Sequence, residues 1–579
     1  MSRVDTLPNS EKKFLQVSAA IGRLFATNIA RAVLDDSEDL TERLNNCRAE
    51  GLIEPDPDGL DTEWRFTHAL IRDAIYGSLL ADQLAVVHSD IADALEARIG
   101  NRQQEMAESL AYHFEKARKP EKAVAYLIMA AGKSQRLYAF DQTDTQLVRA
   151  LEIIEINPEC VTDHVYGNMV TTWFRSLEQA GNFGGLIDLS KRVLPRLQAA
   201  GYSTELALAT TLLAISFTHA REYEQSLKLA TETLDAANVQ NDELSAAWAK
   251  VALMRIYEET AWEGRETIER LAEEIRPVAE NYNDNHIAMM ALYLLSAHYR
   301  SAGEMLKARN VADQIREFAE KHDDRRALSY WCWSVGIIYL LEDNPAEALK
   351  TAEKGLELAL PNSADANVNW AVWIHVQSMF GNPHAAREKL TELLEISRKF
   401  EDYNVYHSMI YTQAILEIKS GKVRKGWNRF QTLFPRVEAA GNVQIWRHIH
   451  LIRAELLMVI SGLIKPPPVK LNEKQSTVKP KPGILDILTL LKLRWSALKL
   501  AKSDFQFFCE RVPFRRGALF ARAQVSLGAI ALARKDKTAA REHLTLGKQL
   551  SEDEQLKHIS DRADRYLEKL RVALSGEKR

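Results

Sequence analysis

A histidine, an arginine and a tyrosine lie four residues apart in the stretch FTHALIRDAIYGSLL, residues 66 to 80. If this stretch is helical, His68, Arg72 and Tyr76 form one line along the helix. A second, apolar line lies beside it and is expected to be buried: Ile71, Ile75 and Leu79. The simplest interpretation is that His68 satisfies a buried backbone group and that Arg72 pairs with a nearby acid such as Asp73 or Glu63. Alternatively, the polar line faces a ligand, and the wider sequence must indicate which one.

No phosphate-binding loop accompanies this line. The pattern G-x-x-x-x-G-K-[S/T], whose backbone N–H groups cradle phosphates, occurs nowhere in the sequence. The nearest string, AAGKSQ at Gly132, Lys133 and Ser134, has Leu127 where the first glycine is required. Its surroundings, AVAYLIMAAGKSQRL, are typical of a helix, so we interpret Gly132 as a packed helix residue. We expect no bound cofactor.

Residues that could bind a metal or catalyse a reaction are scattered. His448 and His450 are two apart, so on a helix they point about 200° away from each other and cannot hold one ion together. The cysteines form no C-x-x-C pair and are expected to be reduced structural thiols: Cys47, Cys160, Cys332 and Cys509. No Ser/His/Asp or Cys/His arrangement has a local signature. We therefore expect no metal site, no catalytic residue and no enzymatic activity.

The composition is that of a folded chain with several cores. Its 579 residues are too many for one hydrophobic core, and 46% hydrophobic with 27% charged residues is ordinary for a globular protein. A net charge of -4 gives no general attraction to nucleic acids or anionic membranes. The polar start and the absence of a run of roughly 20 apolar residues predict a cytoplasmic protein without membrane contact.

From about residue 160 onward a pattern recurs: an aromatic-rich helix, a short polar turn, and a helix with small residues. The turns come about 40 residues apart, at Gly181, Glu222, Glu263, Gly303, Asp343, Asn382 and Lys422. Small or apolar positions after a turn, as at Ala346, Leu349 and Ala352, let the paired helix approach closely. A single hairpin cannot bury such a face, so we predict an all-α fold in which stacked hairpins form an α-solenoid.

Aromatic residues recur on the first helix of successive hairpins. They could line a groove for a protein partner or a small ligand, because rigid aromatic side chains are good anchors. The same positions also fill the core between helices, which is the alternative. The candidate groove residues are Trp331, Trp333, Trp370, Trp373, Tyr406 and Tyr411, and Tyr403 lies beside them.

A proline- and lysine-rich stretch, residues 465–483, interrupts the array and is expected to be a flexible insertion. The helix that follows, GILDILTLLKLRWSALKLA, is apolar over most of its circumference. We expect it to be buried against the last repeats; membrane contact is the alternative, although Lys492, Arg494 and Lys499 interrupt the apolar surface. Residues 484–579 then form C-terminal helical repeats.

Residues 1–80 differ from the repeats of residues 81–464. Three short helices precede two strands around a turn at Pro57, Asp58 and Gly59, which predicts a winged-helix-like domain. Its nine Lys/Arg and fourteen Asp/Glu give a net charge near -5, which disfavours DNA binding. A transcription regulator would need a basic recognition helix, and residues 41–52 are balanced in charge.

The order RFTHALIRDAIYGSLL, then LAYHFEKA, resembles the region downstream of the ATPase domain in signal-transduction ATPases with numerous domains, in particular class III adenylate cyclases with an AAA-type ATPase. The later hairpins are similar to the tetratricopeptide repeat family, although their period is about 40 rather than 34 residues. This resemblance implies a winged helix followed by a helical sensor. It also implies that His68 and Arg72 form a nucleotide-sensing edge.

The expected function is that of a non-catalytic interaction and regulatory scaffold, the sensor half of an ATPase-cyclase signalling system. Its partners would be proteins, including a P-loop ATPase or a nucleotide cyclase on another chain. A second possibility is that the chain is part of a truncated or split adenylate cyclase whose catalytic domains lie upstream or on another chain. Transcription regulation through the winged helix is a third.

Overall fold

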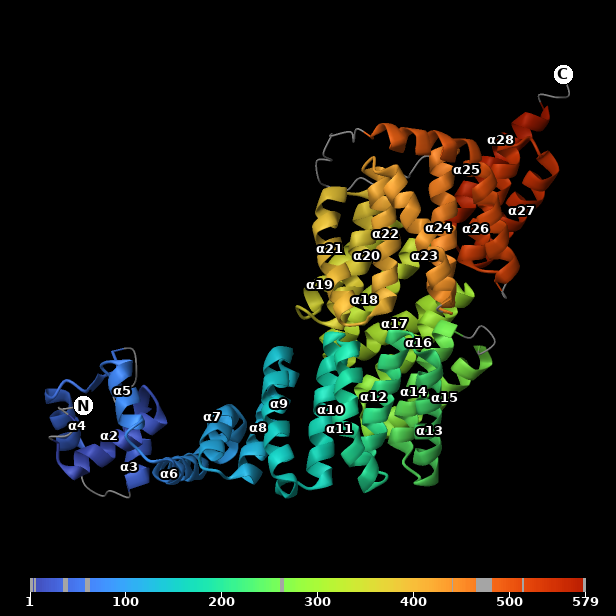
Figure 1. The fold of residues 1–579 in the computed structure, drawn as a ribbon. Coiled ribbons are helices and arrows are strands. Elements are labelled where there is room, and N and C mark those ends of the chain that lie inside the picture. Colours follow the sequence, from blue (N-terminus) through green and yellow to red (C-terminus); the bar gives the residue numbers. More distant parts are fainter. Residues whose placement is uncertain are drawn as a thin grey trace. The chain divides into compact units, whose positions relative to one another are not determined.

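The computed structural model describes residues 4, 7–34, 40–57, 63–260, 265–439, 441–464, 482–512 and 515–575. Two compact units make up the chain, residues 1–176 and 177–579, and the division falls inside helix α10 (Asp163–Ala180). Both units consist mainly of helices, as predicted (Figure 1). The domain limits expected from the sequence, after residues 80, 464 and 483, remain predictions.

The first unit begins with a small module of three helices and three strands. Its elements are α2 (Asn9–Ile21), β1 (Leu24–Ala26), α3 (Thr27–Leu34), α4 (Thr41–Ala49), β2 (Ile53–Pro55) and β3 (Glu63–Phe66). The strands pair antiparallel in the order β1-β3-β2. The sequence did not predict β1, because three residues are too few to show an alternating pattern. The expected turn residues Asp58 and Gly59 lie outside the described residues.

Three phenylalanines form the centre of this module. Phe14 of α2 lies edge-on to Phe25 of β1 at 6.0 Å between ring centres, and Phe25 lies 5.5 Å from Phe66 of β3. All three are fully buried, and buried Cys47 of α4 belongs to the same core. The strand β1 therefore inserts one aromatic side chain between the helices and the sheet.

The stretch FTHALIRDAIYGSLL is helical over about half its length. Helix α5 is Ala69–Tyr76, and His68 precedes it with an exposed side chain. Arg72 donates a hydrogen bond to the carbonyl oxygen of Ala19 at 2.9 Å and pairs with Asp73 at 3.0 Å. Of the apolar line expected to be buried, Ile75 is buried, whereas Ile71 and Leu79 are half-buried because the helix ends after two turns.

Tyr76 leads into a buried hydrogen-bonded chain, here called the histidine chain: Tyr76, His88 and His113. The Tyr76 hydroxyl lies 2.9 Å from Nε2 of His88, and Nδ1 of His88 lies 2.8 Å from Nδ1 of His113. Burial lowers the pKa of His113 to about 4, and burial together with His113, Lys116 and Arg72 lowers that of His88 to about 4. Both rings are therefore neutral at pH 7, so one Nδ1 can donate to the other.

Helical hairpins complete the first unit: α6 (Ala81–Ile99), α7 (Gln103–Lys116), α8 (Pro120–Arg136) and α9 (Phe140–Ile156). His88 lies on α6 and His113 on α7, so the histidine chain joins the N-terminal module to the first hairpin of the same unit. Gly132 lies inside α8, without the strand and loop that a phosphate-binding site requires.

The second unit is a stack of helical hairpins, an α-solenoid as predicted. From α12 to α24, the first helices of successive hairpins begin 39 to 42 residues apart. The helices are α11 (Phe183–Ala200), α12 (Thr204–Ala220), α13 (Tyr223–Val239), α14 (Glu243–Thr260), α15 (Arg265–Tyr282), α16 (Asn285–Ala302), α17 (Met305–Lys321), α18 (Arg325–Leu341), α19 (Pro345–Leu358), α20 (Ala364–Phe380), α21 (Pro383–Lys399), α22 (Tyr403–Lys419), α23 (Val423–Ala439), α24 (Val443–Ser461), α25 (Ile484–Arg511), α26 (Ala518–Ala533), α27 (Lys537–Asp553) and α28 (Lys557–Ser575).

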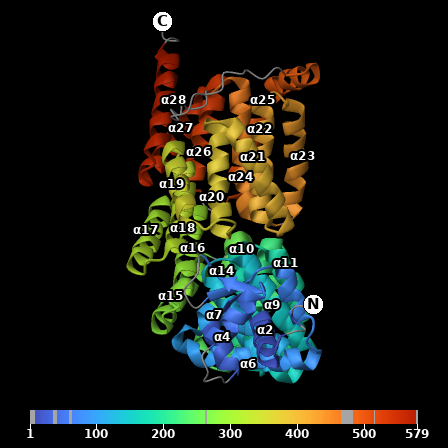
Figure 2. The ribbon, with the colours of Figure 1, turned by 90° about the vertical axis from the view of Figure 1, so that its left-hand side faces the viewer.

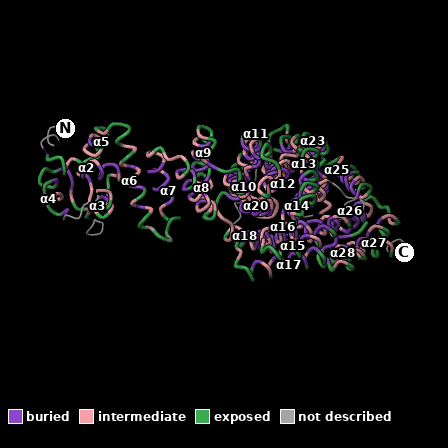
Figure 3. Tube along the Cα trace, turned by 90° about the horizontal axis from the view of Figure 1, so that it is seen from below, coloured by how far each residue is buried: buried purple, intermediate pink, exposed green. Residues whose placement is uncertain are grey.

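Short polar residues start many of these helices. Asp284, Asp324, Asn344, Asn382 and Asn442 each accept a hydrogen bond from a backbone N–H in the first helical turn. Buried and exposed positions alternate at the helical period along second helices such as α21, whereas first helices such as α26 are buried almost throughout; Figure 3 colours the chain by burial. The small residues after the turn at Asp343 are buried at Ala348, Leu349 and Ala352, whereas Ala346 is exposed, one position off the expected face.

The solenoid curves until hairpins distant in sequence meet. Figure 1 shows α22 and α24 above α12 and α14. Two contacts join these parts of the chain: the Gly184 N–H donates to the Phe400 carbonyl at 3.0 Å, and the His219 ring lies 3.3 Å from the Asp402 carboxylate. Further along, the backbones of Gly303 and Gly517 touch; a Cβ at position 517 would lie 2.1 Å from the Gly303 oxygen. The first helices of distant hairpins therefore face one another across an interior space.

Helix α25 differs from the prediction that it is buried. Its second half packs through Ala501, Phe505 and Phe508, but much of its first half is exposed. The exposed apolar residues are Ile484, Leu485, Ile487, Leu488, Leu491 and Trp495, the last with 96% of its surface accessible. At 28 residues, α25 is longer than α24, against which it packs, so its first turns extend past the neighbouring helices (Figure 2). The insertion predicted at 465–483 lies almost wholly outside the described residues.

Candidate functional site

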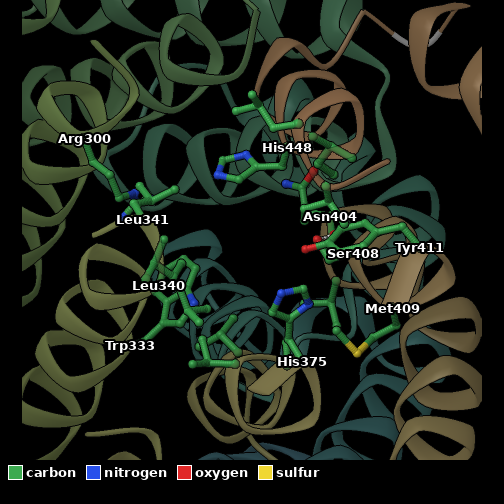
Figure 4. Close-up of a pocket in the computed structure, with 18 of the residues that line it drawn as sticks. Arg300, Trp333, Leu340, Leu341, His375, Asn404, Ser408, Met409, Tyr411 and His448 are labelled. Carbon is green, nitrogen blue, oxygen red and sulfur yellow. Dashed lines mark hydrogen bonds between the residues drawn. The ribbon is translucent and has the colours of Figure 1, made fainter. Parts of the chain in front are cut away.

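A cavity of about 260 Å³ lies where the first helices of the hairpins face one another (Figure 4). Besides Pro345 at the start of α19, eight helices contribute to its lining, namely α12, α14, α16, α18, α20, α22, α24 and α26. These helices form the inner layer of the solenoid, so residues up to about 300 positions apart in sequence line one space. We call it the inner cavity.

One side of the inner cavity is apolar. Trp333, Leu340 and Leu341 of α18 lie together on it, whereas Met409 of α22 lies across the cavity near Ser408 and Tyr411 (Figure 4). The Trp333 ring stacks on Tyr293 with 5.1 Å between ring centres. This stacking holds the indole in one position and presents a rigid, flat surface to the cavity.

Glu259 holds together the two ends of the superhelical turn. Its carboxylate accepts hydrogen bonds from Asn404 at 2.6 Å, Asn442 at 3.2 Å and Tyr223 at 3.1 Å, and it lies 3.5 Å from Arg255. The partners come from α14, from α13, from the start of α22 and from the residue before α24. Because Glu259 is 97% buried, this satisfied carboxylate fixes the hairpins around the inner cavity.

A second ion-pair group lies near α26. Arg522 pairs with Glu455 of α24 through two of its nitrogens and lies 4.0 Å from Asp343. Asp343 also pairs with Arg562 of α28 at 3.4 Å, and together the two arginines outweigh burial and lower the pKa of Asp343. These charges compensate one another within the protein.

Arg300 lacks such compensation. This residue of α16 lines the inner cavity and is 92% buried, and its Nη1 atom has no hydrogen-bond partner in the described part of the chain. The carboxylate that attracts it electrostatically is Glu258, whose own pKa is raised by burial and by neighbouring Glu259. A buried guanidinium with an unsatisfied N–H is costly unless a ligand or water completes its hydrogen bonds.

Two histidines face the cavity from other sides. His375 of α20 lies 3.3 Å from the Thr412 hydroxyl. Burial, with smaller contributions from His448, Arg522 and Lys419, lowers the pKa of His375 to about 4. His448 of α24 lies across from it (Figure 4). Neutral at pH 7, the His375 ring can either donate or accept a hydrogen bond.

The predicted groove residues separate into different environments. Trp333 and Tyr411 line the inner cavity, and Trp370 lines a second hollow, of about 280 Å³, between α20 and α21. Trp331 lies near the cations of Arg316 and Lys354, and Trp373 packs in the core between α18 and α22. Tyr406 packs edge-on to Tyr403.

The remaining site residue predicted from the sequence, His68, lies in the first unit beside Arg72, whose guanidinium is satisfied by Ala19 and Asp73. The structure thus provides an internal role for Arg72 and leaves the His68 ring exposed. Burial raises the pKa of Cys47 and Cys509 to about 12 and that of Cys332 to about 11, so these free thiols are unreactive at pH 7.

Sequence reasoning missed Arg300, His375 and the cavity position of His448. A usable signal existed for Arg300, because ALYLLSAHYRSA carries an arginine in the last turn of an otherwise apolar helix. For His448, the sequence excluded only metal chelation together with His450. In the structure His450 lies 3.3 Å from Asp504, while His448 faces the cavity.

Within the described residues, no three His, Cys, Asp or Glu side chains are grouped as metal ligands would be. Among the described helices, none combines the length and hydropathy that crossing a bilayer requires.

Comparison with known proteins yields structural neighbours only. No protein-family model matches the sequence, and no curated protein matches it. Among solved structures, a Rap protein in complex with competence and sporulation factor is similar with a TM-score of 0.42 at 11% identity, covering 67% of this chain and 99% of that one.

Two further neighbours have lower scores. A signal-transduction ATPase with numerous domains and a tetratricopeptide repeat sensor, PH0952 from Pyrococcus horikoshii, has a TM-score of 0.30 at 14% identity, covering 87% of this chain and 66% of that one. A monomeric IFIT1 mutant with a capped RNA has a TM-score of 0.28 at 12% identity, covering 82% and 91%. Since all three scores lie below 0.5, we infer the function of this chain from its inner cavity.

Proposed function

We propose that this protein is an effector-responsive interaction scaffold: a small ligand enters the inner cavity, and its binding changes which partner protein the solenoid retains. The observation that supports this most is the position of the cavity at the closure of the superhelix. A ligand there touches α14 and α16 on one side and α22 and α24 on the other. Its binding would stabilise the closed arrangement relative to an open one.

The size of the cavity fits a small molecule better than a folded partner. About 260 Å³ lies near the lower end of the volumes that small-molecule pockets typically have. The partner protein would therefore bind elsewhere on the solenoid, and the ligand would act as its regulator. Separate sites for the ligand and the partner protein distinguish this proposal from a simple peptide-binding groove.

We extend this proposal to the first unit. Its order of helices and strands, with three helices before the β2–β3 pair, is compatible with a winged-helix-like module. The exposed His68 ring is available to a nucleotide-binding partner such as a P-loop ATPase or a cyclase. In this proposal the chain is the sensor half of an ATPase-cyclase signalling system.

The test uses the full chain as bait in extract from its native cells, with and without the small-molecule fraction of that extract. Ala371 lines the inner cavity on α20, so Ala371→Phe fills it, whereas Ala236→Phe adds the same group to an exposed position on α13. We expect the small-molecule fraction to change which proteins the wild-type and Ala236→Phe chains retain, but not those retained by Ala371→Phe. Retention that is indifferent to the fraction, or equally responsive in Ala371→Phe, would refute the proposal.

A further inference from the structure

Arg300 and Arg255 of the inner cavity each keep one buried nitrogen without a hydrogen-bond partner among the described residues, Nη1 and Nε respectively, but Arg255 and Arg522 also make close contacts with other side chains. Arg255 donates to the Tyr293 hydroxyl at 3.3 Å and to the His219 ring at 2.9 Å, and Arg522 pairs with Glu455. The Nη1 atom of Arg300 has no partner in the described part of the chain, although the residue is 92% buried. A desolvated guanidinium that lines a cavity and has an unsatisfied N–H is complementary to an anion.

The carboxylates of the lining limit how much negative charge the ligand can carry. Those within reach of the cavity are Glu258, Glu259, Asp343, Asp402 and Glu455. Asp402 is paired with His219, Glu259 with Arg255, and Glu455 and Asp343 with Arg522. Arg255, Arg522 and the His219 ring are therefore already engaged, and Glu258 attracts Arg300. A ligand with several negative charges would meet five acidic side chains, with the Nη1 of Arg300 as an unsatisfied donor. A single negative charge fits this balance.

The rest of the lining indicates the body of the ligand. Figure 4 shows Trp333, Leu340 and Leu341 on the same side as Arg300, and Asn404, Ser408 and Tyr411 across the cavity. The apolar group offers a surface for a hydrocarbon chain or ring next to the guanidinium. The opposite side offers few polar contacts, because Asn404 and Ser408 already bond within the protein.

From these contacts we propose that the inner cavity binds a small amphipathic organic anion with one carboxylate. The carboxylate accepts hydrogen bonds from Arg300, and the apolar body lies against Trp333, Leu340 and Leu341. This inference rests on the proposed function, since it names the ligand class of the same site. The preference for a single negative charge also excludes ATP and ADP as ligands of this cavity, because their phosphates carry several negative charges.

The test is calorimetric titration of the full chain with a series of straight-chain carboxylates from butanoate to decanoate. Octanol, octylammonium and ADP serve as neutral, cationic and polyanionic probes. At least one carboxylate should bind the wild-type chain, and the three other probes should bind more weakly. Arg300→Gln should weaken carboxylate binding by roughly 10- to 100-fold, the usual size of a charged hydrogen-bond pair. Arg300→Lys should retain part of the affinity, because the charge remains while the planar fork is lost.

The control is Arg398→Gln, which removes an exposed arginine on the outer helix α21 and should leave binding unchanged. Circular dichroism melting of each variant separates loss of binding from loss of fold. Equal carboxylate affinity in folded Arg300→Gln, stronger binding of octanol or ADP than of any carboxylate, or no carboxylate binding to the wild type would each overturn the inference. The proposed function would still stand if the small-molecule fraction changed which partners the wild-type chain retains and Ala371→Phe abolished that change. Failure of the carboxylate proposal can therefore be told apart from failure of the proposed function.

Discussion

The histidine chain of the first unit and the inner cavity of the second both contain buried ionisable side chains. Only in the histidine chain do these side chains all have hydrogen-bond partners. Tyr76, His88 and His113 bond to one another in series and remain neutral. In the inner cavity Glu259 is similarly surrounded by donors, whereas Arg300 keeps an N–H without a partner. A polar network whose hydrogen bonds are all made within the protein stabilises the fold. A network with an unsatisfied donor marks a place where a ligand can supply the missing partner.

The largest expected effect comes from removing a satisfied charge at the seam of the solenoid. Glu259→Ala leaves Arg255 without its carboxylate and removes acceptors from Asn404 and Asn442. Breaking a buried pair in this way typically costs about 3–5 kcal/mol. Urea unfolding followed by circular dichroism measures it. Glu224→Ala, at an exposed position on α13, is the control and should change stability by less than about 0.5 kcal/mol.

Acidification should loosen the histidine chain. Because the pKa of His88 and His113 is about 4 in the folded protein against about 6.5 when unfolded, the unfolded state binds more protons as pH falls. Their stabilisation is complete above about pH 6.5 and is lost progressively between pH 6.5 and 4. The loss by pH 4 is on the order of 3 kcal/mol for one such histidine.

Hydrogen exchange of α5 to α7, at pH 7 and pH 4.5, measures this loss locally. A variant with both His88→Gln and His113→Gln cannot titrate there and serves as the comparison. Protection that falls equally in the wild type and the double variant would contradict the assignment. Protection that falls in the wild type alone is the expected result.

Removing the unsatisfied arginine should cost far less than removing Glu259. Arg300→Met takes away a buried N–H without a partner, so we expect the free energy of unfolding without ligand to change by no more than about 1 kcal/mol. The same urea titration measures it. A loss as large as that of Glu259→Ala would show that Arg300 is structural.

The smallest effect is expected on α25. Trp495 is 96% exposed, so Trp495→Ser should change stability by less than about 0.5 kcal/mol. By contrast, Phe505→Ala on the buried half of the same helix should cost about 3–5 kcal/mol. Similar losses at both positions would restore the sequence-based expectation that the whole helix is buried.

The sequence predicted those features that arise from local order. Turns about 40 residues apart, with small residues after them, predicted the hairpins, and the recurrence of aromatics on first helices singled out Trp333 and Tyr411. Whether these two residues bind a ligand remains a prediction. The helical fold itself is confirmed.

The inner cavity could not be predicted in the same way, because it depends on how far the solenoid curves. Asn442 bonds to Glu259 across 183 residues, and no periodicity of a single hairpin indicates that meeting. The face of α25 was mispredicted for a related reason. An apolar sequence predicts a buried helix, but the exposure of α25 depends on where its neighbouring helices end.

Native mass spectrometry of the full chain, after incubation with the small-molecule fraction of its own cells, tests the central claim most directly. The wild-type chain should carry a small bound mass that fragments as a monocarboxylate, and Arg300→Gln and Ala371→Phe should lose it while Arg398→Gln retains it. A wild-type chain without any bound mass, or the same bound mass in the Arg300→Gln chain, would contradict the assignment of the inner cavity as an anion-sensing site.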